Sequence, residues 1–291
     1  MSRLRSSLQP IVPHRLVWWL RSSLRGVLHY EANFGFRTLA SLAQRLLALG
    51  GGLLGMIAGP AGATTLVAAW TPTTTVIGAD SFTHTLDDEK QWSKCKIRRA
   101  GPVLWTATGI LGNPEFNFSL DRLVDEAMSR PERLDARIKA FEAALVVPLS
   151  EVVENIRVEN PSWYVRRAKG LAVTRVIFSA NEDGVNRFWT REFVAKSAPV
   201  GRWVNISVKR TDCPGPACQH RRVFLLGQYD YARKIADDAA TWEQNGTAEA
   251  VRRAIEAEIE NNPRHVGPPI AIAEMTKDGV KWIEKGLCGE K

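Results

Sequence analysis

From residue 64 onward, blocks of strand-like segments alternate with pairs of segments that have helical spacing. Two alternating apolar runs come first, Thr65–Trp70 and Thr74–Ala79, and the Thr71-Pro72-Thr73 break between them predicts a hairpin. A third strand is expected over Pro102–Thr108. This order strongly limits the possible folds, because each apolar face must be buried against another element.

The helical pairs follow these strands. The apolar spacing from Phe116 to Ala127 predicts one helix, and Pro131 is expected at the first position of a second helix that continues past Pro148. Later strands are expected over Leu171–Ala180, Val185–Trp189, Arg222–Leu226, Ile270–Met275 and Val280–Ile283. Between the third and fourth of these we expect a helix from about Asp230 to Ala240 and another capped by Thr247. The order predicts an α+β fold with two sheets and helices on their outer faces.

The positive charge of the chain is concentrated at its N-terminus. The 291 residues contain 39 Lys and Arg against 31 Asp and Glu, a net charge of +8. Residues 1–63 hold seven basic residues and one acidic residue, so the remainder has a net charge of only +2. No basic stripe with interleaved aromatics appears after the leader, and we therefore expect no nucleic-acid partner.

Residues 1–63 have the features of a leader rather than of a domain. Residues 46–58 are apolar and uncharged, Arg45 precedes them, and Ala61-Gly62-Ala63 follows. A basic flank, a short apolar run and an A-x-A site are typical of a secretory signal peptide. We therefore expect export to the periplasm or the medium, with a leader over residues 1–63 and a domain over residues 64–291. The alternative is an uncleaved anchor that holds the protein to a membrane through residues 46–58.

Four cysteines, Cys95, Cys213, Cys218 and Cys288, follow the leader. An even number in an exported chain permits two disulfides, and Cys213 and Cys218 are close enough for a local one. With His220, these two could instead suggest zinc, but no second ligand pair follows at the usual spacing. No metal and no cofactor are expected.

Three residues stand at a distinctive spacing if Thr64 is the first residue of the mature chain. Asp80 then lies 16 positions on, and Lys96 lies 32 positions on. The opening Thr64–Val67, the block Val76–Ser81 and the pair Lys96-Ile97 resemble proteasome β subunits and their bacterial ring-protease relatives. The expected signal-peptidase site falls immediately before the same threonine.

This resemblance implies a four-layer αββα sandwich of the N-terminal-nucleophile (Ntn) hydrolase type, and it implies association into a ring-like homo-oligomer. It makes Thr64 the nucleophile, with Lys96 and Asp80 beside it. The segment 101–109 resembles the strand that ends at the oxyanion-hole glycine of the family, which assigns that role to Gly109, one residue earlier than in the family.

The proposed chemistry explains these residue types. A threonine hydroxyl needs a base to take its proton, and the α-amine of an N-terminal threonine can be that base. Its unperturbed pKa of about 7.7–8.0 is near working pH. A lysine charge beside the amine favours the neutral amine and alkoxide character, and an aspartate holds that lysine. A backbone N–H of Gly109 would face the developing oxyanion.

Several positions depart from the family pattern. Ala63 precedes the threonine where the family has glycine, and Phe82 stands where arginine is common. The turn that supports the nucleophile corresponds to Gly227-Gln228-Tyr229, and the segment expected to assist the amine corresponds to residues 262–267. These departures weaken the expected support of the amine more than they weaken the expected fold.

The sequence thus predicts an exported threonine-type hydrolase, a peptidase or amidohydrolase acting on a peptide or amide substrate. A second interpretation is a catalytically inactive proteasome-like protein, structural or membrane-anchored, whose Thr64 is never freed. A third is an unrelated exported α+β protein in which Thr64 is an ordinary strand residue and Asp80 and Lys96 form a structural ion pair.

Overall fold

The computed structural model describes residues 64–84, 91–196, 203–218 and 220–289. These residues belong to one compact unit, Met56–Lys291. The expected leader over residues 1–63, with its apolar run and its A-x-A site, lies outside the described residues. Among the residues described, no helix is long and apolar enough to cross a membrane.

One five-stranded antiparallel sheet, called sheet I here, contains the first two strands of the domain. Its strand order is β12-β1-β2-β13-β14. The strands are β1 (Thr65–Trp70), β2 (Thr75–Ala79), β12 (Arg222–Gly227), β13 (Ala271–Thr276) and β14 (Gly279–Glu284). The expected hairpin of β1 and β2 is confirmed, with Leu66 opposite Ala79.

A second five-stranded antiparallel sheet, sheet II, has the order β11-β10-β9-β6-β5. Its strands are β5 (Ile97–Ala100), β6 (Val103–Gly109), β9 (Ala172–Glu182), β10 (Val185–Lys196) and β11 (Asn205–Cys213). Two minor pairs complete the strands described, β3 (Phe82–His84) with β4 (Gln91–Ser93) and β7 (Gly112–Asn113) with β8 (Phe118–Ser119).

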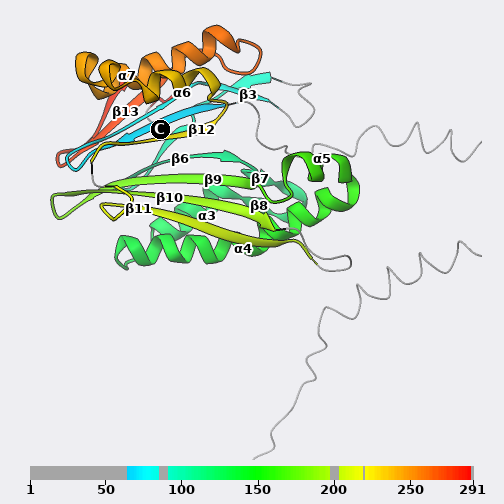
Figure 1. Ribbon diagram of the computed structural model, residues 1–291. Helices are drawn as coiled ribbons and strands as arrows, with labels where there is room; N and C mark the ends of the chain where they lie inside the picture. The colour runs from blue at the N-terminus through cyan, green and yellow to red at the C-terminus, as the bar shows by residue number, and fades with distance from the viewer. Residues whose placement is uncertain (1–63, 85–90, 197–202, 219, 290–291) are drawn as a thin grey trace, which may run out of the picture. The chain divides into compact units, whose positions relative to one another are not determined.

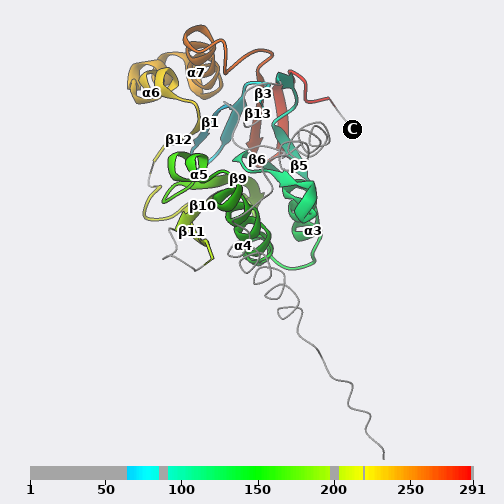
Figure 2. The ribbon, with the colours of Figure 1, turned by 90° about the vertical axis from the view of Figure 1, so that its right-hand side faces the viewer.

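The helices cover the two sheets separately. A 3-10 turn, η2 (Pro114–Phe116), precedes α3 (Leu120–Met128), α4 (Leu134–Glu159) and α5 (Pro161–Arg167), and α6 (Asp230–Asp237) and α7 (Ala239–Asn261) follow β12. Figure 1 and Figure 2 show α6 and α7 beside sheet I, and α3 and α4 beside sheet II. The expected α+β class is therefore confirmed.

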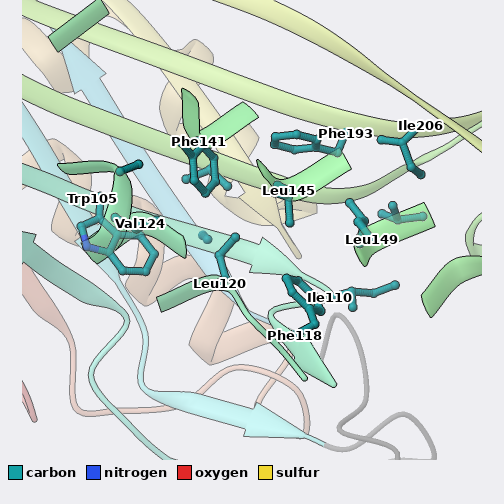
Figure 3. Packing of buried hydrophobic residues seen from close by; sticks show 14 of the residues in the cluster. Trp105, Ile110, Phe118, Leu120, Val124, Phe141, Leu145, Leu149, Phe193 and Ile206 are labelled. Carbon is teal, nitrogen blue, oxygen red and sulfur yellow. The ribbon is translucent and has the colours of Figure 1, made fainter. Parts of the chain in front are cut away.

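Three clusters of buried side chains hold these elements together. The first packs α3, α4 and α5 against sheet II, the second includes apolar residues of both sheets, and the third packs α6 and α7 against sheet I. In the first cluster, shown in Figure 3, Phe141 of α4 contacts Phe178 of β9 edge to face, with ring centroids 5.2 Å apart. Leu145 and Leu149 extend the same face of α4 at four-residue spacing. Each fully buried side chain of this size contributes roughly 1.5–3 kcal/mol to folding.

Some predicted boundaries are wrong for identifiable reasons. The helix expected from Pro131 begins only at Leu134. The backbone of Arg133 is still extended, and its carbonyl accepts the first hydrogen bonds of the helix. The predicted continuation of this helix past Pro148 is confirmed, and buried residues on both sides of Pro148 pack in the first cluster. The break expected before Thr247 is present as a kink at Gly246, with φ of 75°, but α7 already begins at Ala239, where the first helix of the pair was expected to end.

Strand β11 was not predicted at all. It lies at the edge of sheet II, and its exposed residues include Arg210 and Asp212. A strand at the edge of a sheet pairs with one neighbour only and is partly exposed, so its residues need not alternate strictly between apolar and polar.

Two disulfides join the four cysteines. The expected local bond between Cys213 and Cys218 is present, and Cys95 is bonded to Cys288. A disulfide sulfur is no thiolate ligand, so the zinc interpretation of Cys213, Cys218 and His220 is wrong.

Candidate functional site

Thr64 lies immediately before β1 and is almost fully buried, with 7% of its surface exposed. Its carbonyl oxygen accepts a hydrogen bond from Gln228 N–H at 2.7 Å. The next hydroxyl, Thr65 Oγ1, donates to the carbonyl of Gln228, also at 2.7 Å. Two hydrogen bonds therefore connect the turn after β12 to the start of β1. This turn is the segment 227–229 that the family resemblance assigned to supporting the nucleophile.

Gly227 is required at this turn by its backbone. Its φ is +82°, in the left-handed region, and it pairs with Thr65 across β1 and β12. A Cβ at this position would lie 1.7 Å from the carbonyl oxygen of Thr64. No side chain fits there, so the close approach of the turn to Thr64 depends on glycine.

We expect Gly227→Ala to destabilise the protein by about 3 kcal/mol, because the left-handed backbone and the clash with Thr64 act together. Urea unfolding followed by circular dichroism measures the loss. The matched control is Gly184→Ala: Gly184 has a φ of +77°, but a Cβ there would meet nothing within 4 Å. The control should lose only about 1 kcal/mol. Equal losses in both variants would contradict a specific role of the contact with Thr64.

Asp80 follows β2 and is 1% exposed. Its Oδ1 accepts from Thr65 N–H at 2.8 Å and from Lys96 Nζ at 2.7 Å. Its Oδ2 accepts from the backbone N–H groups of Phe82 and Gly267, at 3.0 and 3.3 Å. Four donors occupy the two oxygens, and only an ionised carboxylate can accept all of them. Burial raises the pKa of Asp80, while Lys96 and these donors oppose the rise.

Lys96 connects Asp80 to Thr64. Its Nζ lies 2.9 Å from Thr64 Oγ1 and 2.7 Å from Asp80 Oδ1, and the residue is 8% exposed. Its backbone is held as well, since Thr106 Oγ1 of β6 donates to its carbonyl at 2.8 Å. Burial lowers the pKa of Lys96 to about 8, and the Asp80 carboxylate limits that decrease. The structure therefore brings Thr64, Asp80 and Lys96, which are far apart in the sequence, into one contiguous cluster.

Gly109 is the last residue of β6 and has a φ of +101°. A Cβ there would lie 2.2 Å from the carbonyl oxygen of Val173, so this position also requires glycine. The following N–H, that of Ile110, donates to Val173 at 2.8 Å. Along a strand of an antiparallel sheet, successive N–H groups point to opposite sides. The Ile110 N–H points toward Val173, so the Gly109 N–H points away from β9. No hydrogen bond joins Gly109 to Thr64 in the described part of the chain.

The segment 262–267 also reaches the cluster, through the backbone of Gly267. Gly267 donates its N–H to Asp80, and its carbonyl accepts from Ser81 N–H at 3.1 Å. A Cβ on Gly267 would meet the ring of Phe82, the residue that replaces the arginine common in the family. The sequence predicted none of these contacts of Gly267, because each joins segments nearly 190 residues apart.

Two cationic residues near the cluster were not predicted as site residues from the sequence. Lys94 and Arg98 flank Lys96 at alternate positions, a pattern visible in the sequence as Lys-x-Lys-x-Arg. Alternation is the signal that could have placed the three on one side of an extended segment. Within the described ranges, no group of three or more His, Cys, Asp or Glu residues is arranged to hold a metal ion.

Comparisons with known proteins show a likeness to solved structures, but not to a family model or a curated sequence. Among solved structures, the chain is similar to Anbu (ancestral beta-subunit) from Yersinia bercovieri, with 15% sequence identity and a TM-score of 0.46. The match covers 76% of this chain and 87% of that chain.

Proposed function

We propose that the chain is an exported Ntn hydrolase with a four-layer αββα sandwich, which cleaves amide or peptide bonds with Thr64 as nucleophile. The observation that carries the proposal is the position of Lys96 Nζ, within hydrogen-bond distance of both Thr64 Oγ1 and Asp80 Oδ1. A buried ammonium held against a threonine hydroxyl has an evident use in hydrolysis, because it stabilises the oxygen as it loses its proton.

The reaction begins once the bond between Ala63 and Thr64 is cut. The free α-amine of Thr64 takes the proton of Oγ1 while Oγ1 bonds to the substrate carbonyl carbon. The carbonyl oxygen becomes an oxyanion, for which Gly109 N–H is the proposed donor. The intermediate collapses as the C–N bond breaks, and the α-ammonium gives its proton to the leaving amine. Water then hydrolyses the ester and restores the hydroxyl.

Lys96 acts in this scheme through its charge. Its ammonium favours the neutral form of the neighbouring α-amine and stabilises negative charge on Oγ1. Asp80 keeps the ammonium in place and, with all four acceptor positions occupied, cannot itself be the base. The base is therefore assigned to the amine of Thr64.

Export is supported by the two disulfides, because such bonds persist in oxidising compartments. The signal peptide over residues 1–63 supplies the route, and its cleavage after Ala63 frees the nucleophile. Association into a homo-oligomer remains a prediction.

The N-terminal residue of the protein recovered from its host tests this function. Intact mass should correspond to a chain that begins at Thr64, and a threonine-directed covalent inhibitor should add one equivalent of mass. A chain that retains the leader has no amine at Thr64. That result would reject the hydrolase proposal in favour of an anchored, inactive protein.

We expect a narrow pH optimum for kcat/KM. The activity should rise as the α-amine loses its proton, with a pKa of about 7.7–8.0 before any shift. It should fall again as Lys96 loses its ammonium, since a lowered pKa of about 8 means that the charge is lost when the pH rises through that value. Above it, kcat/KM should decrease about tenfold per pH unit.

The measurement is a pH profile of kcat/KM with a neutral amide substrate. The pKa of Lys96, measured by NMR in Thr64→Ala, should match the descending limb. Constant activity between about pH 8 and 10 would contradict a role for the Lys96 charge.

A further inference from the structure

A small pocket opens directly beside Lys96. Its lining includes Lys94 and Lys96 from the segment before β5, Arg98 from β5, Trp105 and Ala107 from β6, and Asp121 from α3. Lys96 also contacts Thr64 Oγ1, so this lysine connects the pocket to the atom proposed to attack the substrate. Gly109, the proposed oxyanion donor, stands two residues beyond Ala107 on the same strand.

The pocket combines a cationic side with apolar walls. Lys94, Lys96 and Arg98 alternate with Cys95 and Ile97, which pack in the cluster shared by the two sheets. Across β5 and β6, Arg98 pairs with Trp105, and its guanidinium lies 5.4 Å from the centroid of that ring. The apolar walls can contact methylene groups, while the lysine ammonium groups favour a partner that carries negative charge or accepts hydrogen bonds.

Two of the three cations already have a carboxylate partner. Lys96 is paired with Asp80, and Arg98 with Asp121. No carboxylate among the described residues forms an ion pair with Lys94, although this residue is only partly exposed. Burial, together with the charge of Arg98, lowers the pKa of Lys94. The pocket therefore holds one positive charge that no group of the described protein compensates.

A second unsatisfied donor belongs to the wall. Trp105 is 3% exposed, and its indole Nε1–H has no hydrogen-bond partner among the described residues. A buried indole N–H usually has an acceptor. The Lys94 ammonium and the Trp105 indole N–H line the same pocket. Each of them lacks an oxygen acceptor among the described residues.

We propose that this pocket binds the carboxylate side chain of the substrate residue whose carbonyl Thr64 attacks. The inference rests on the proposed function and names its substrate class, amides and peptides with glutamate or aspartate on the acyl side of the cleaved bond. The carboxylate pairs with Lys94, and the methylenes of the side chain lie along Trp105 and Ala107. A glutamine of the same shape lacks the charge, so the pocket discriminates between the two.

The first test compares two fluorogenic peptides that differ only in glutamate or glutamine before the cleaved amide. We expect the protein from its host to show a kcat/KM at least tenfold higher for the glutamate peptide. Lys94→Gln should abolish that ratio, and Lys94→Arg should keep it. The control Lys139→Gln, which removes an exposed lysine of α4, should leave the ratio unchanged. A ratio near one, or a preference that depends on the leaving-group side, would overturn the proposal.

The second test requires no turnover. Binding of the same two peptides to Thr64→Ala is measured by calorimetry, with the Thr64→Ala, Lys94→Gln double variant beside it. We expect about tenfold tighter binding of the glutamate peptide, and loss of the difference in the double variant. This preference without any hydrolysis by the parent protein would refute the proposed function and leave the pocket assignment standing. Hydrolysis of both peptides without a preference for glutamate would refute the pocket assignment and leave the proposed function standing.

Discussion

Thr64→Ala is expected to reduce hydrolysis to background, a loss in kcat/KM of about 10⁴-fold or more. The substitution removes Oγ1, the only atom proposed to bond to the substrate. It keeps the contacts that hold the chain at this point, because the Thr64 carbonyl still accepts from Gln228 N–H. The measurement is kcat/KM on the best amide substrate, with intact mass to check that the leader is still removed.

Stability should change little in Thr64→Ala. Lys96 loses its hydrogen bond to Oγ1 but keeps its ion pair with Asp80, so the free energy of unfolding should fall by about 1–2 kcal/mol. The conservative variant Thr64→Ser retains a hydroxyl and an amine and should retain measurable activity. If Thr64→Ala retained full activity in a correctly processed chain, the nucleophile would be a different group.

Lys96→Ala is expected to lower both activity and stability. We expect kcat/KM to fall about 10³-fold, since the charge that stabilises the Thr64 oxygen is gone. We also expect a loss of about 3 kcal/mol in the free energy of unfolding, because Asp80 stays buried without its cation. Three backbone N–H groups still donate to Asp80, which places this estimate at the lower end for a broken buried pair.

The double variant Asp80→Asn, Lys96→Met separates the two effects. It removes both charges, so it should recover part of the stability lost in Lys96→Ala while remaining inactive. Lys277→Ala is the control for an exposed pair, Lys277 with Asp278, and should change stability by less than about 1 kcal/mol. Recovery of activity in the double variant would show that Lys96 acts only by neutralising Asp80.

Local patterns were sufficient for much of the fold. The alternation in Thr65–Trp70 and the Thr-Pro-Thr break after it predict the hairpin of β1 and β2, because both signals lie within a few residues. The spacing of apolar residues likewise predicts α3, α4 and the part of α7 after Thr247. The start of α4 was misplaced, since packing against a sheet can shift a helix end by a turn.

Local patterns in the sequence predict the alternation of the main strand and helix blocks and permit the pairing of Cys213 with Cys218. Thr64, Asp80 and Lys96 were singled out because their spacing matches the proteasome β-subunit family that this segment resembles. The packing of the two sheets places Lys96 between Thr64 and Asp80, brings the backbones of Gly227 and Gly267 to this cluster, and leaves Lys94 without an anionic partner among the described residues. These contacts join segments as many as 187 residues apart, as in Gly267 and Asp80. Such contacts depend on how two sheets pack, and no local period encodes that packing.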